Sequence, residues 1–174
     1  MSQAFQEGRI LFEFPENWRV CRPGKSSYYR NRFQGFCGGS KETDFLLFEP
    51  DQRVLWLLEV KDYTTDRRTK TSDLCDEIAL KVRDVLALLM AGATNDPPSN
   101  QGIGAFMATC GLPLVIKVVL HLEQPSKPSA LFPGVKNRAD FAQMLRHKVH
   151  CIDPHAKVVS TAQSHPHWKS HWAS

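Results

Sequence analysis

Residues 43–63, with the sequence TDFLLFEPDQRVLWLLEVKDY, are two apolar runs joined by a turn, and three of their charged side chains do not fit that pattern. Asp44 precedes the first apolar run, and Glu59 and Lys61 lie near the end of the second. A strand buried on both faces does not ordinarily carry a carboxylate and an ammonium, because burying a charge costs free energy unless the charge is paired. Two carboxylates and a lysine brought together could hold a divalent cation and act on a phosphodiester.

The three side chains meet only if the two apolar runs pair as a hairpin in one particular register. Glu59 and Lys61 are two residues apart on one strand, so their side chains leave the same face of a sheet. If residues 50–53 form a four-residue turn, Asp44 lies directly opposite Glu59, with the two β-carbons about 5 Å apart. A slip of one residue would move Asp44 to the other face, so the register tests the predicted site.

Two carboxylates at this separation repel each other unless a cation lies between them. A hard divalent ion such as Mg²⁺ or Mn²⁺ prefers oxygen ligands and keeps several of its waters. We therefore predict a metal site formed by Asp44, Glu59 and the backbone carbonyl of Val60. Lys61 would lie beside the ion, where it could orient an attacking water or neutralise charge on a phosphate.

The elements around this stretch follow from the spacing of apolar residues. Residues 44–49 and 54–63 are apolar on both faces, which is typical of strands in a central sheet that is covered on both sides. Residues 72–91 carry apolar side chains at spacings of three and four and predict a helix that Ser72 caps and Gly92 ends. Further elements are expected at residues 103–110 (helix), 112–122 (strand), 137–149 (helix) and 156–160 (strand), with possible strands at 9–14 and 18–22.

The order of these elements from residue 44 onward indicates an α/β protein, with a mixed central β-sheet flanked by helices. The chain has 174 residues, of which 42% are hydrophobic, so it is long enough to build one substantial core. We predict a single domain over residues 1–160. Residues 161–174 include HPHWKSHWAS, which has no core pattern, and are expected to form a tail or a partner-docking segment.

The combination of Asp44 with Glu59-Val60-Lys61 after a hairpin resembles the D…(D/E)-x-K motif of the PD-(D/E)XK nuclease superfamily, which has the restriction-endonuclease-like fold. The resemblance extends from residue 44 to about residue 160, roughly two-thirds of the chain. It implies that Asp44 and Glu59 bind the metal and that Lys61 is the catalytic lysine. It also implies a Mg²⁺-dependent endonuclease or exonuclease, a hydrolase of phosphodiester bonds. We expect DNA before RNA as its substrate, although the sequence itself does not distinguish the two. Many members add a glutamate from a preceding helix, for which the candidates here are Glu7, Glu13, Glu16 and Glu42.

Two alternative interpretations of the three charged residues stay open. Glu-x-Lys tripeptides are common, and these charges could form an ion pair at the edge of the sheet. The fold could also be retained with an inactive site, as a module that binds nucleic acid or a protein partner within a larger complex. Cleavage of nucleic acid that depends on a divalent metal and on Lys61 would distinguish the enzyme from both.

Two basic segments are candidates for nucleic-acid contacts. The loop at residues 64–70 leaves the predicted active-site strand and could touch phosphates. The segment 25–33 interleaves cations with aromatic rings, which suits stacking on bases, although buried rings with exposed arginines explain the same pattern. The residues expected to contact nucleic acid are Arg67, Arg68, Lys70, Lys25, Tyr28 and Arg30.

Other polar residues could contribute to a site. Asp62 should point to the face opposite Lys61 and pair with the basic loop, and His121 could reach the site from a neighbouring strand. The spacing of the histidines near the end of the sequence could suit zinc, but no cysteine or carboxylate lies close in sequence to complete that site. These histidines are His165, His167 and His171.

The composition sets broad limits. The formal charge of +4 is compatible with a polyanionic partner but does not require one. The five cysteines are odd in number and lack metal-ligand spacing, so we expect reduced thiols. No secretory signal and no apolar run of membrane-spanning length is visible. We therefore expect a cytoplasmic protein without a membrane partner, which binds nucleic acid as a homodimer or within a larger nucleoprotein complex.

Overall fold

The protein is a mixed α/β structure with two β-sheets, and the computed structural model describes residues 1–66, 68, 72–125 and 137–173. The larger sheet contains, in spatial order, β3 (Arg19–Cys21), β4 (Phe45–Glu49), β5 (Val54–Asp62), β6 (Val115–Glu123) and β7 (Lys157–Val159). β4 is antiparallel to both of its neighbours, β3 and β5, whereas β6 runs parallel to β5 and to β7. The sheet is therefore mixed, as the sequence predicts.

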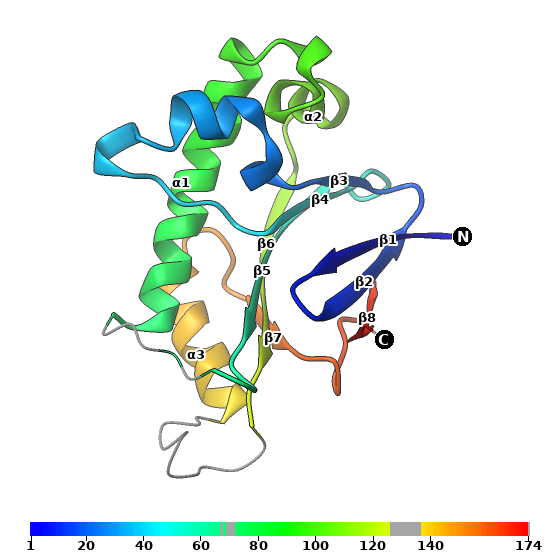
Figure 1. Ribbon diagram of the computed structural model, residues 1–174, viewed down its shortest axis with the longest axis vertical. Helices are drawn as coiled ribbons and strands as arrows, with labels where there is room; N and C mark the ends of the chain where they lie inside the picture. Colours follow the sequence, from blue (N-terminus) through cyan, green and yellow to red (C-terminus); the bar gives the residue numbers. More distant parts are fainter. Residues whose placement is uncertain (67, 69–71, 126–136, 174) are drawn as a thin grey trace.

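Helices cover one face of this sheet, on the left in Figure 1. The α-helices among the described residues are α1 (Leu74–Asn95), α2 (Ile103–Cys110) and α3 (Arg138–Val149). Short helical turns are η1 (Pro23–Lys25), η2 (Tyr29–Phe33), η3 (Phe36–Gly38) and η4 (Pro98–Asn100). The core on this side joins Leu46 and Leu57 of the sheet to Ile78, Leu88 and Leu145 of the helices. No helix in the described part of the chain is both long and apolar enough to cross a membrane.

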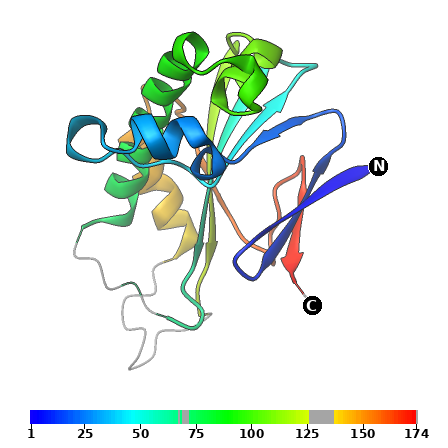
Figure 2. The same ribbon diagram turned by 45° about the horizontal axis from the view of Figure 1, so that its top comes forward.

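A second sheet, not helices, covers the other face. It contains β1 (Ser2–Glu7), β2 (Ile10–Pro15) and β8 (Lys169–Trp172), all antiparallel, and Figures 1 and 2 show it on the side of the large sheet away from the helices. Phe12 and Phe14 of this sheet pack against Phe45, Trp56 and Leu58 of the large one. The expected helical cover is therefore found on one face only. The aromatic residues of β2 supply the apolar area that buries the other face.

Residues 161–174 do not form the free tail that their polar sequence suggests. Their strand pairs with β2, and Leu11 lies opposite His171. Trp168 is only 4% exposed and lies in the core between the two sheets. This strand is short and polar, and its partner is near the start of the sequence, so no local pattern reveals it. The domain boundary at residue 160 stays a prediction, but the segment beyond it is part of the packed structure.

Helix α1 begins and ends later than the sequence predicts. Its N-cap is Asp73, not Ser72, because the Asp73 carboxylate accepts a hydrogen bond from the Cys75 backbone N–H at 2.8 Å. Gly92 lies inside the helix and does not end it. A β-carbon at this position would lie 2.3 Å from Cγ2 of Ile103, so glycine is needed for the close approach of α1 and α2.

Candidate active site

The hairpin of β4 and β5 has the register on which the predicted site depends. The turn between the strands is residues 50–53, and Phe45 pairs with Leu58. Continuing this register by one pair sets Asp44, directly before β4, opposite Glu59. The Asp44 carboxylate accepts a hydrogen bond from the Val60 backbone N–H at 2.7 Å, which holds it beside β5. The predicted register is confirmed, and both carboxylates are on the face of the sheet that α1 covers.

Glu59 accepts contacts from two lysines at a single oxygen. Its side chain is 1% exposed, and Oε1 lies 2.5 Å from Nζ of Lys61 and 2.7 Å from Nζ of Lys81. Lys61 comes from the same strand, two residues along, whereas Lys81 comes from α1. The structure therefore brings together the three residues that the sequence singled out and adds a fourth.

Lys81 is not among the predicted site residues, although its position in the apolar stripe of α1 indicates it. Ile78 and Val85 belong to the apolar stripe of α1 and are buried. Lys81 follows Ile78 by three residues and precedes Val85 by four, so a charged side chain falls on the face that packs against the sheet. Its side chain is 13% exposed. A lysine inside a buried stripe indicates an acidic partner below the helix, and that partner is Glu59.

The electrostatics of the cluster disfavour two free carboxylates. Burial raises the pKa of Asp44, and the Val60 N–H and Lys81 oppose that shift only in part. Burial and then the charge of Asp44 raise the pKa of Glu59, which the two lysines oppose. Burial acts to lower the pKa of Lys61, but Glu59 outweighs it and the pKa is raised. Since the charge of Asp44 contributes to raising the pKa of Glu59, a cation between the two carboxylates would relieve that repulsion.

The donor set fits a small divalent cation. Oε2 of Glu59 is buried and has no hydrogen-bond partner among the described residues. A hard divalent cation can bind such an oxygen together with an oxygen of a second carboxylate and several waters. Within the described residues, no group of three or more histidine, cysteine, aspartate or glutamate side chains could hold a metal, so any ion here would rely on Asp44, Glu59 and non-side-chain ligands. Val60 contributes its N–H to Asp44, and the role predicted for its carbonyl stays a prediction.

A small pocket opens above Asp44. Its volume is about 210 Å³, and its lining includes Asp44 together with Glu7, Glu42, Arg22 and Lys25. Glu7 and Glu42 were two candidates for an added acidic residue, and both reach this pocket. Glu7 forms an ion pair with Arg22, and its charge contributes to raising the pKa of Asp44. Asp44 is thus accessible from this side, whereas Glu59 lies behind it.

The residues expected to bind nucleic acid have different surroundings. Lys25 and Arg30 are exposed and line a second pocket. Tyr28 is only 9% exposed and packs in the helix-side core, so burial of the rings with exposure of the arginines is confirmed. Arg68 donates to Glu77 at 3.0 Å and to Ser72. Arg67 and Lys70 lie outside the described residues.

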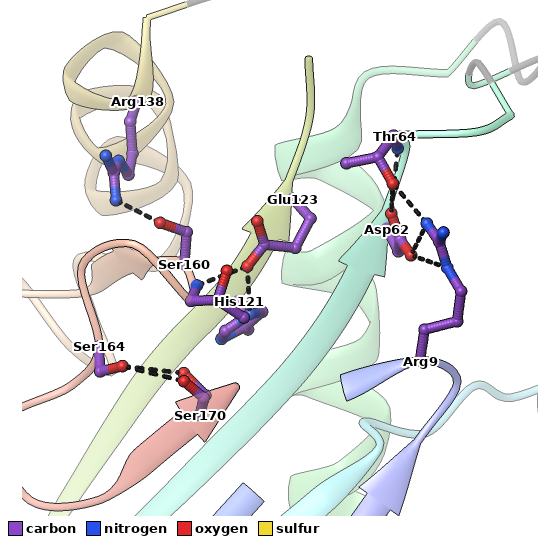
Figure 3. Close-up of polar contacts among 10 residues, drawn as sticks. Arg9, Asp62, Thr64, His121, Glu123, Arg138, Ser160, Ser164 and Ser170 are labelled. Atoms are coloured by element: carbon purple, nitrogen blue, oxygen red, sulfur yellow. Dashed lines mark hydrogen bonds and ion pairs between the residues drawn. The ribbon is translucent and has the colours of Figure 1, made fainter. Parts of the chain in front are cut away.

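His121 and Asp62 lie on the other face of the sheet, as Figure 3 shows. His121 pairs with Val60 and is fully buried against Phe12, with its Nε2 2.8 Å from Oε1 of Glu123. The suggestion that His121 reaches the site is therefore wrong, because its position in β6 turns it away from α1. Asp62 does point away from Lys61, as expected.

The described partner of Asp62 differs from the expected one. Arg9, at the turn between β1 and β2, lies 2.6 Å from the Asp62 carboxylate, and the Thr64 backbone N–H donates to it at 3.0 Å (Figure 3). The ion pair thus connects the small sheet to β5, where an ion pair with the basic loop was expected. The ion pair is partly exposed and structural in character.

Two of the three histidines near the end of the chain, His165 and His167, pack with aromatic rings, whereas the exposed His171 lies 3.6 Å from Glu13. His165 stacks on Trp168 with ring centroids 3.8 Å apart, and burial lowers the pKa of His165 to about 3. A neutral, buried histidine in this core is a packing residue, and no metal-binding group of three such side chains occurs in the described ranges. None of the five cysteines, all within the described residues, forms a disulfide, and the reduced state of their thiols stays a prediction.

Comparison with known proteins gives little further information. No family model matches the chain, and no solved structure matches it. The chain is similar to a cysteine–tRNA ligase of Neisseria meningitidis serogroup A / serotype 4A (strain DSM 15465 / Z2491), with 29% identity over 174 aligned residues. The alignment covers 82% of this chain and 24% of the ligase, so the chain spans about a quarter of that protein.

Proposed function

We propose that the protein is a metal-dependent nuclease that hydrolyses phosphodiester bonds, with the restriction-endonuclease-like fold and the site of the PD-(D/E)XK superfamily. The observation that carries this proposal is the hairpin register, which sets Asp44 opposite Glu59 with Lys61 beside them on one face. The hairpin, the following helix α1 and the parallel strand β6 support the fold assignment, since the motif of that superfamily lies on such a hairpin.

Each residue of the cluster has a distinct role in this mechanism. Asp44 and Glu59 would hold Mg²⁺ or Mn²⁺, which when bound supplies positive charge at the scissile phosphate and acidifies water. Lys61 holds its ammonium beside Glu59, where it neutralises charge on the phosphate or orients the attacking water. Lys81 fixes Oε1 of Glu59 from the helix side and is a positioning residue. In hydrolysis the oxygen of a water forms a bond to phosphorus while the bond from phosphorus to the leaving oxygen breaks. The proton that the water loses balances the proton that the leaving oxygen gains.

A second candidate function is a nucleic-acid or protein-binding module without activity. The contacts of Glu59 favour it, because Lys61 and Lys81 already compensate this carboxylate. A buried carboxylate with two lysines can be a purely structural arrangement. In this alternative the charged cluster connects α1 to β5, and binding would involve other surfaces. A homodimer or a larger complex is compatible with the nuclease and with the binding module.

The deciding experiment is a cleavage assay with a matched variant. The protein is incubated with plasmid, linear and single-stranded DNA and with RNA, in Mg²⁺, in Mn²⁺ and in chelator. RNA substrates include tRNA, because the similar ligase is named for it. The nuclease predicts cleavage that needs the metal and is lost in Lys61→Ala. Equal cleavage by Lys61→Ala and wild type would exclude the mechanism, and salt-sensitive binding without cleavage would support the module.

A further inference from the structure

A second, larger pocket lies between β3, the segment of η1 and η2, and α2. Its volume is about 500 Å³, within the range of about 300–1,000 Å³ that is usual for small-molecule sites. Four basic side chains contribute to its lining, and no acidic residue does so within the described chain. These side chains are Arg19, Arg22, Lys25 and Arg30.

Among the described residues, three of the four cations have no counterion. Arg19, Lys25 and Arg30 are exposed, and within the described residues no carboxylate lies at ion-pair distance from them. Only Arg22 is paired, with Glu7, and its guanidinium also lies over the Phe45 ring. Unpaired like charges around one concave surface repel each other, and a bound anion relieves the repulsion. The charge pattern therefore indicates an anionic ligand.

The α2 side of the pocket forms a partly apolar wall. Gly102 at the N-cap, Ala105 and Thr109 follow one another at spacings of three and four and line the pocket together with Phe106. Gly102 cannot carry a larger side chain, because its β-carbon would lie 2.6 Å from an oxygen of Asp96 behind the wall. An apolar wall facing several cations suits a ligand with a flat ring and a phosphate.

This pocket adjoins the one above Asp44. Arg22 and Lys25 line both pockets, so they form the ridge between them. A ligand with phosphates on both sides of the ridge would reach the carboxylate from the larger pocket. A nucleic-acid strand has phosphates at regular spacing and a base at each, and it meets this requirement.

We propose that the larger pocket binds one nucleotide of a single nucleic-acid strand, with its phosphate on Arg19, Lys25 and Arg30 and its base against α2. The neighbouring phosphate then crosses the ridge toward Asp44. The identity of this strand as a substrate rests on the proposed nuclease function, whereas binding in the pocket does not.

The test measures binding of a fluorescein-labelled ten-nucleotide strand, as DNA and as RNA, to the full chain in excess chelator, where no metal-dependent cleavage occurs. Arg30→Glu changes the pocket, and Arg32→Glu makes the same change in charge on the same exposed segment outside it. Thr109→Trp fills the pocket without changing its charge, and Ala108→Trp adds the same ring at the neighbouring exposed position.

We expect Arg30→Glu and Thr109→Trp each to weaken binding by about tenfold or more, and both controls to change it by less than about twofold. Thymidine 5′-monophosphate should displace the strand, and thymidine should not. Equal weakening by Arg30→Glu and Arg32→Glu, or unchanged binding by Thr109→Trp, would overturn the proposal. If the variants show the expected binding pattern but the protein cleaves no substrate with any metal, the pocket proposal stands and the nuclease proposal fails. Failure of the one proposal can therefore be told from failure of the other.

Discussion

The two faces of the large sheet shift the pKa values of their acidic side chains in opposite directions. On the α1 side, the pKa values of Asp44 and Glu59 are raised, mainly by burial. On the side of the small sheet, burial also acts to raise the pKa values of Asp62 and Glu123, but hydrogen bonds outweigh it and both are lowered. Glu59 and Asp62 belong to the same strand, so the contrast comes from their neighbours.

The difference lies in the partners that each acid has. Asp62 has Arg9 and the N–H and hydroxyl of Thr64, and Glu123 has His121 and the Thr161 N–H (Figure 3). Each of these acids is satisfied and joins two elements. Asp44 and Glu59 face each other, and one oxygen of Glu59 has no partner among the described residues. Burial alone therefore does not indicate a functional site, whereas two facing acids, one of which raises the pKa of the other, make this face the candidate.

The largest expected effect is a difference in cleavage rate between variants on the two faces of the large sheet. Glu59→Ala should lower the cleavage rate by about 1,000-fold or more, since it removes one of two proposed metal ligands. Asp62→Ala, three residues along the same strand but on the other face, should retain cleavage within about threefold. Rates are measured on single-stranded and plasmid DNA in Mg²⁺, with folding checked by circular dichroism. Equal losses in both variants would mean that the two faces do not differ in function.

Lys81 tests whether the α1 face is positioned by its helix. Lys81→Met should lower the cleavage rate by about 10- to 100-fold, because Oε1 of Glu59 loses one of its two fixed contacts. Arg83→Met, on the same helix with an exposed side chain, is the matched control and should leave the rate unchanged. If Lys81 had only a structural role, Lys81→Met would lower the free energy of unfolding and leave the cleavage rate unchanged. Denaturant unfolding is therefore measured together with the rate. An unchanged rate with lowered stability would make Lys81 a purely structural residue.

The opposite face should respond in stability. Glu123→Ala should lower the free energy of unfolding by about 1–3 kcal/mol at pH 7, because buried His121 and the Thr161 N–H lose their acceptor. The pKa of Glu123 is lowered from its ordinary 4.5. The ionised carboxylate therefore stabilises the fold fully above pH 4.5, and this contribution is lost as the pH falls through the folded pKa.

Urea unfolding at several pH values measures this difference. The stability gap between wild type and Glu123→Ala should narrow below pH 4.5. Glu16→Gln, at an exposed position, is the control and should follow the wild type. A gap that is constant down to pH 3 would show that the charge of Glu123 contributes nothing.

The smallest expected effect is a change in the free energy of unfolding that differs in sign between two matched variants. Asp44→Asn keeps an acceptor for the Val60 N–H and removes a buried charge whose pKa is raised, so metal-free stability should stay level or rise by up to about 1 kcal/mol. Asp62→Asn weakens a partly exposed ion pair and should cost about 0.5–1 kcal/mol. Both are measured by denaturant unfolding in chelator. Equal destabilisation by the two changes would remove the electrostatic distinction between the faces.

The local parts of the site could be predicted from the sequence. The length of the turn at residues 50–53 determines the register of the hairpin, and a period of two determines which side chains share a face. The helix after the hairpin follows from its apolar stripe. Both patterns operate within about twenty residues, so no tertiary information is needed for them.

The non-local parts could not be predicted in the same way. The face on which His121 lies depends on how β6 pairs with β5 in parallel, and nothing local determines that register. Lys81 lies near Glu59 only because α1 packs back onto the sheet. Asp62 pairs with Arg9, which is far away in sequence. Each of these contacts needs the arrangement of whole elements.

The pairing of β8 with β2 has a consequence for how the chain folds. Strands from opposite ends of the described chain close the small sheet, and loop closure over such a separation is slow. Until residues 169–172 have been made, Phe12 and Phe14 have neither a complete sheet nor Trp168 to cover them. During synthesis the hairpin of β1 and β2 therefore leaves apolar rings uncovered until β8 has been added, and we expect it to be prone to aggregation over that interval.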